Sequence, residues 1–83
     1  MTALEHADKI MASPRGSFLL VCEPVFVTPF HHGGELALTP GARVRVHVSD
    51  GTTMHGITEN AEDIMFGANK CFAFEAKPQG RRK

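Results

Sequence analysis

The stretch LTPGARVRVHVSDGTTMHGIT, residues 38–58, contains the clearest secondary-structure signal in the chain. Its start, Thr39-Pro40-Gly41, is typical of a turn. Proline presets φ at the second position of the turn, and glycine adopts the positive φ that a type II turn needs at the next position. The residues that follow alternate strictly between valine and a basic side chain, which predicts a half-buried strand. Asp50-Gly51 then predicts a tight turn and a returning strand. The inward residues of the first strand are Val44, Val46 and Val48, and the outward residues are Arg43, Arg45 and His47.

The return strand can pair with the first strand in two registers. A two-residue loop at Asp50-Gly51 pairs Val46 with His55 and places His55 on the apolar face. A three-residue loop pairs Val46 with Met54 and turns His55 outward, beside the basic residues. A slip of one residue reverses every side chain of a strand, and the sequence leaves both registers open.

The N-terminal segment is expected to form a helix over residues 2–12. Thr2 and Glu5 match a capping box, in which each side chain satisfies a free backbone N–H at the helix start. Pro14 and Gly16 end the helical pattern. The apolar run 17–22 then predicts a buried strand, 25–27 continues it past Pro24, and 35–38 forms a short strand before the central hairpin.

The C-terminal half is less clearly patterned. Residues 59–67 fit either a short helix or a turn followed by a strand at 64–66, and we favour the turn and strand. Residues 67–70 then form a second hairpin loop, and 71–76 form the last strand. Residues 77–83 are expected to be a disordered basic tail.

These elements predict one mostly β (α+β) domain over residues 1–76, with a single N-terminal helix. Several short strands separated by turn signals favour a small antiparallel barrel or a bent sheet, SH3-like or OB-like in architecture. The expected core residues are Leu4, Ile10, Phe18, Leu20, Val44, Val46, Val48, Phe72 and Phe74.

Charge is unevenly distributed along a chain whose formal net charge is zero. The segment KPQGRRK, residues 77–83, carries four basic residues, whereas residues 1–76 hold five basic and nine acidic residues. An acidic body is unlike the folded surface of a dedicated nucleic-acid-binding protein. The N-terminus is polar and the longest apolar run is too short to span a membrane, so we expect a cytoplasmic protein with reduced cysteines and no membrane association.

The sequence predicts no enzyme, no metal site and no cofactor. Four histidines and both cysteines are potential zinc ligands, but their spacing matches no zinc motif. Neither cysteine lies in a turn or at a helix start, where a reactive thiolate would be favoured. These residues are Cys22, His31, His32, His47, His55 and Cys71.

Binding of another protein is the function that we expect. The glycine-flanked loop with Phe30, His31 and His32, and Met54 of the return strand, are the candidate contact residues. An acidic turn at 59–63 would also suit an adaptor or an inhibitor that imitates nucleic acid. Because so short a chain buries a limited core, a homodimer is a natural supplement to its stability.

Nucleic-acid binding is the alternative function. Arg43, Arg45 and His47 form a basic stripe on one strand face, and Arg81 and Arg82 add charge from the tail. Such side chains neutralise phosphates. Base stacking requires exposed aromatic residues, and we expect most of the six phenylalanines to be needed for the core.

Overall fold

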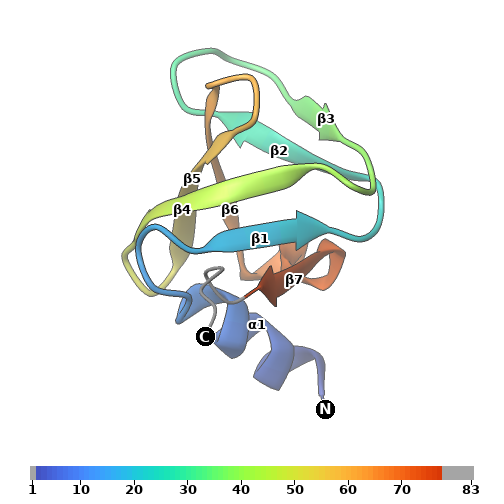
Figure 1. Ribbon diagram of the computed structural model, residues 1–83, viewed down its shortest axis with the longest axis vertical. Helices are drawn as coiled ribbons and strands as arrows, with labels where there is room; N and C mark the ends of the chain where they lie inside the picture. Colours follow the sequence, from blue (N-terminus) through green and yellow to red (C-terminus); the bar gives the residue numbers. More distant parts are fainter. Residues whose placement is uncertain (1, 78–83) are drawn as a thin grey trace, which may run out of the picture.

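The computed structural model describes residues 2–77, which form a bent antiparallel sheet of seven strands with one helix packed at its end (Figure 1). The elements in chain order are α1 (Ala3–Met11), β1 (Phe18–Val21), β2 (Val25–Pro29), β3 (Leu36–Leu38), β4 (Arg43–Ser49), β5 (Thr53–Thr58), β6 (Asp63–Gly67), the 3-10 helix η1 (Ala68–Ala73) and β7 (Phe74–Lys77).

The sheet is a half-barrel with the strand order β3-β2-β6-β5-β4-β1-β7. Only residues 22–24 separate β1 from β2 in the chain, yet the two strands lie four places apart in the sheet. The sheet must therefore curve strongly to let one strand lead directly into the other. The prediction of a mostly β fold with a bent antiparallel sheet and one N-terminal helix is confirmed.

Helix α1 begins with the predicted capping box. Thr2 Oγ1 accepts from the backbone N–H of Glu5 at 3.1 Å, and Glu5 Oε1 accepts from the backbone N–H of Thr2 at 2.8 Å. The helix buries Ala7 and Ile10. The expected burial of Leu4 is wrong, because the buried face is centred on these two residues and leaves Leu4 71% exposed.

Strand β1 buries the opposite face from the one that we expected. Leu19 and Val21 are in the core, whereas Phe18 and Leu20 are half-buried and point outward. The apolar run around β1 has no polar alternation, so the sequence pattern could not show which face is inward.

The central hairpin follows neither of the two expected registers. Val46 lies opposite Gly56, but Val48 lies opposite His55, so a β-bulge at His47 adds one residue to β4. A bulge of this kind reverses the alternation of the residues that follow it. Val48 consequently points outward, with half of its surface exposed, instead of joining Val44 and Val46 in the core.

The segment after β5 is a turn followed by strand β6, as favoured from the sequence. The expected hairpin loop at 67–70 is wrong, and the last strand, expected at 71–76, begins only at Phe74. The chain instead forms η1 and crosses to the far end of the sheet, where β7 pairs with β1. The short helix turns Cys71 inward and leaves Phe72 54% exposed, while Phe74 is buried as expected.

The predicted basic tail lies outside the described residues, except for Lys77, which ends β7. Arg81 and Arg82 therefore have no described position. No helix in residues 2–77 is long and apolar enough to cross a membrane.

Candidate functional site

The outer face of the sheet carries a continuous row of side chains across neighbouring strands. Arg45 of β4 lies opposite Ile57 of β5, and Ile57 lies opposite Asp63 of β6. Phe18 of β1 lies opposite Arg45, and Phe30, which follows β2, donates its backbone N–H to the Asp63 carbonyl at 2.8 Å. We call Phe18, Arg45, Ile57, Asp63 and Phe30 the outer row.

A second row runs beside the outer row on the same face. The strand pairings place Val48 opposite His55, His55 opposite Met65, and Met65 opposite Thr28. None of these four side chains is buried. We call them the second row, and its central residue His55 faces outward because Met54 faces the core.

Phe30 is exposed but held by its neighbours. Its ring lies edge-on to His31, with ring centroids 5.0 Å apart and planes at 89°, and edge-on to His55, at 5.7 Å and 73°. His31 is itself anchored, because its Nε2 lies 2.8 Å from Asp63 Oδ2. The Phe30 side chain nevertheless remains 52% exposed, so the loop presents an oriented aromatic ring on the surface.

The structure therefore brings together part of the residue set expected to bind protein. Phe30 and His31 lie on the outer face and His32 is exposed in the same loop. Met54 is wrong as a contact residue, because it is 1% exposed and fills the core. Sequence reasoning missed His55 as part of this surface, since its direction depended on the unknown hairpin register.

The basic stripe of β4 is on the surface, but its members differ in their surroundings. Arg43 Nε lies 3.6 Å from Glu59 Oε2, which offsets its charge. Arg45 has no carboxylate partner within the described chain, and its guanidinium lies 5.2 Å from the centre of the Phe18 ring. A hollow of about 280 Å³ adjoins Arg45, Phe18, Ile57 and the Arg43–Glu59 pair. His47 is exposed at the bulge.

The phenylalanines do not chiefly serve the core. Of the six in the chain, only Phe66 and Phe74 are buried. Phe26, Phe30 and Phe72 are exposed, and Phe18 is half-buried beneath Arg45. The expectation that most of them fill the core is therefore wrong: η1 leaves Phe72 exposed, the reversed face of β1 turns Phe18 outward, and Phe26 lies on the exposed face of β2.

The acidic turn between β5 and β6 is partly neutralised within the chain. Glu59 lies beside Arg43, and Asp63 lies beside His31. Glu62 supports the turn through its backbone, which exchanges hydrogen bonds with Thr58. Only part of the negative charge of this turn is therefore available to a basic partner.

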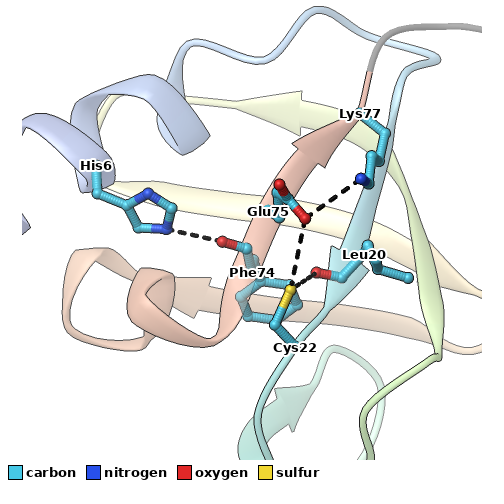
Figure 2. Close-up of polar contacts among 6 residues, drawn as sticks. All are labelled: His6, Leu20, Cys22, Phe74, Glu75 and Lys77. Atoms are coloured by element: carbon cyan, nitrogen blue, oxygen red, sulfur yellow. Dashed lines mark hydrogen bonds and ion pairs between the residues drawn. The ribbon is translucent and has the colours of Figure 1, made fainter. Parts of the chain in front are cut away.

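The two cysteines occupy different environments. Cys22 is exposed, and its Sγ lies 3.7 Å from the Leu20 carbonyl oxygen and 3.8 Å from Glu75 Oε1 (Figure 2). Cys71 is buried, and this burial raises the pKa of its thiol. Cys71 is thus a small core residue, whereas Cys22 lies on the surface. Within residues 2–77 no three histidine, cysteine or acidic side chains are grouped to hold a metal ion.

Comparisons with protein-family models, with curated proteins and with solved structures find no match to this chain.

Proposed function

We propose that this protein is a small non-enzymatic protein-binding module, an adaptor or an inhibitor, and that the outer sheet face around Phe30 is its docking surface. The observation that carries the proposal is the exposed Phe30 ring held against His31 and His55. Aromatic residues are frequent energetic centres of protein interfaces. A ring that is already oriented loses less conformational entropy on binding, which favours affinity.

The composition of the surface supports a protein partner. Ile57, His55 and Met65 provide partly apolar contact area beside Phe30, and Asp63 and Arg45 provide opposite charges at the sides. This mixture of an aromatic anchor, an apolar centre and flanking polar groups resembles an interface between proteins. Residues 2–77 also contain nine acidic and six basic residues, a balance that disfavours a polyanionic ligand.

The proposal is tested by affinity capture from an extract of the native host, with three forms of the protein as bait. The wild type and Phe72→Ala should retain the same discrete partner, whereas Phe30→Ala should lose it. Phe72 is the matched control, because its exposure of 54% resembles the 52% of Phe30 while it lies on η1, away from the outer row. Equal capture by Phe30→Ala, with all three circular dichroism spectra alike, would exclude this surface.

The cytoplasm is the compartment that we propose for this protein. The support is the exposed thiol of Cys22, which a reducing compartment would preserve. Fractionation of the native host should recover the protein with the cytosolic proteins, and recovery from an oxidising compartment would contradict this location.

Nucleic-acid binding is a second candidate, favoured by one observation. The Arg45 guanidinium lies over Phe18 beside an open hollow, and arginine with an exposed ring can stack on a base. Titration of the labelled protein with a mixed single-stranded oligonucleotide tests it by amide NMR at low and moderate salt. Shifts at Phe18 and in β4 that persist at moderate salt would favour this function, and their absence would leave the protein-binding module.

A further inference from the structure

Along the outer row, the side chains at equal distances on either side of Ile57 are chemically complementary to each other. From β1 to the end of β2 it reads aromatic, cationic, aliphatic, anionic and aromatic. These positions are Phe18, Arg45, Ile57, Asp63 and Phe30. When a second copy is rotated by 180° about an axis that passes through Ile57 in the plane of the surface, each residue on one side of Ile57 in the first copy faces the residue on the other side in the second copy. Two copies of the chain related in this way would meet along β5, with Ile57 against Ile57 and the cation on one side of it facing the anion of the other copy.

We infer that a second copy of this chain docks on the outer face, with its two-fold axis passing near Ile57 and close to the direction of β5. The inference rests on the proposed function, since it names a partner for that same surface. The contact is isologous, so each contact between two different residues occurs twice, once on either side of the axis.

Arg45 is the charge that this arrangement satisfies, and its partner would be Asp63 of the other copy, whose Oδ2 also lies 2.8 Å from His31 Nε2 in its own chain. Within one chain Ile57 lies between Arg45 and Asp63, and no ion pair joins these two residues. Arg45 accordingly has no carboxylate partner in the described part of the chain. Across the two-fold axis, Arg45 of each copy faces Asp63 of the other.

The second row supports the same axis independently. It places Val48 on one side of His55 and Met65 on the other. Rotation about β5 therefore lays Val48 of one copy against Met65 of the other, which removes two apolar side chains from water. Val48 is on this face only because of the β-bulge at His47. Facing sheets pack about 10 Å apart at about 30°, a separation that these side chains can bridge.

Sedimentation equilibrium of the wild-type protein from about 1 µM to 1 mM is the first test. A reversible monomer–dimer equilibrium in this range is expected, with concentration-dependent amide shifts centred on His55 and Ile57. A monomer at every concentration would overturn the inference. Continued capture of another protein through Phe30 would then leave the proposed function standing, so the two failures are distinguishable.

Charge reversal locates the interface. Arg45→Glu alone and Asp63→Arg alone should each weaken dimerisation at least about tenfold, because each creates two repulsive contacts at the symmetric interface. An equimolar mixture of the two variants should form a heterodimer with wild-type affinity, because both contacts then join opposite charges.

Two controls keep this test decisive. Circular dichroism and thermal melting verify that both variants are folded, and recovery in the mixture itself requires folded chains. Glu35→Arg, an exposed reversal on the loop before β3, should leave the dimer unchanged. Two results would overturn the inference, because each would place any dimer contact elsewhere. One is dimerisation that does not change when Arg45 or Asp63 is reversed, and the other is a mixture in which the two variants do not associate.

Discussion

Gly56 in β5 lies so close to β4 that a Cβ atom on it would overlap Val44 Cγ1 and lie 2.9 Å from the carbonyl oxygen of Arg45. Gly56→Ala should therefore force the hairpin apart and lower the free energy of unfolding by about 1–3 kcal/mol. Chemical denaturation measures this loss. Gly33→Ala is the matched control, because nothing lies within 4 Å of a Cβ at that position, and equal stability of the two variants would contradict the packing described.

His6 joins α1 to the end of the sheet. Its Nε2 lies 3.0 Å from the Cys71 carbonyl oxygen and 2.7 Å from that of Phe74, where Figure 2 shows the ring directed at β7. His6→Ala should cost about 1–2 kcal/mol and increase amide exchange in η1 and β7, because the two carbonyls lose their shared donor. Leu4→Ala, at an exposed position of the same helix, should be near neutral. A larger loss from Leu4→Ala would show that α1 packs through a different face.

Asp50 makes the β4–β5 turn sensitive to acid. Its Oδ1 accepts from the Thr52 N–H at 2.9 Å, the Thr53 N–H at 2.7 Å and the Thr52 hydroxyl at 2.9 Å. The Thr52 backbone hydrogen bond is the largest cause that lowers the pKa of this carboxyl, followed by that of Thr53. A lowered pKa in the folded state means stabilisation that is complete above the unfolded value of about 3.9 and is lost as the pH falls below it.

Asp50→Ala should accordingly melt below the wild type at neutral pH by a few degrees. The difference should shrink as the pH falls from about 4 through the lowered pKa of Asp50, where the wild type loses the same interaction. Thermal melts of both proteins at a series of pH values measure this convergence. A melting-temperature difference that is the same at neutral and strongly acidic pH would show that the carboxylate charge is not involved.

The two thiols should react at very different rates. Cys22 is exposed, whereas Cys71 is buried with a raised pKa, so its thiolate is both scarce and inaccessible. A thiol reagent at neutral pH should modify Cys22 quickly and Cys71 only on unfolding. Mass spectrometry identifies the cysteine that is modified in each phase. Cys22→Ser should abolish the fast phase. Rapid labelling of Cys71 in that variant would mean that η1 opens readily.

The sequence predicted where the helices and strands lie better than it predicted which of their faces is buried. The capping box at Thr2 and Glu5 and the alternation at Val44 and Val46 are local signals, and the structure retains both. The outward turn of Val48 follows from a bulge, which depends on pairing with β5 and leaves no mark in β4 alone. The position of β7 beside β1 likewise depends on contacts between distant segments.

The candidate surface was predicted only in part for the same reason. Phe30 and His31 stand out in the sequence as an aromatic and an imidazole beside two glycines. Asp63 and His55 become their neighbours only after β5 and β6 pair and Met54 turns inward. A surface assembled from three strands and a loop cannot be read from one stretch of the chain.

Site-specific photo-cross-linking tests the docking surface most directly. A photoreactive phenylalanine derivative replaces either His32, exposed in the loop beside Phe30, or Phe72, exposed on η1, and the protein is irradiated in its native host. We expect a discrete protein adduct from position 32 and none from position 72. Adducts from position 72 alone, or equal adducts from both positions, would contradict the assignment of the outer face as the docking surface.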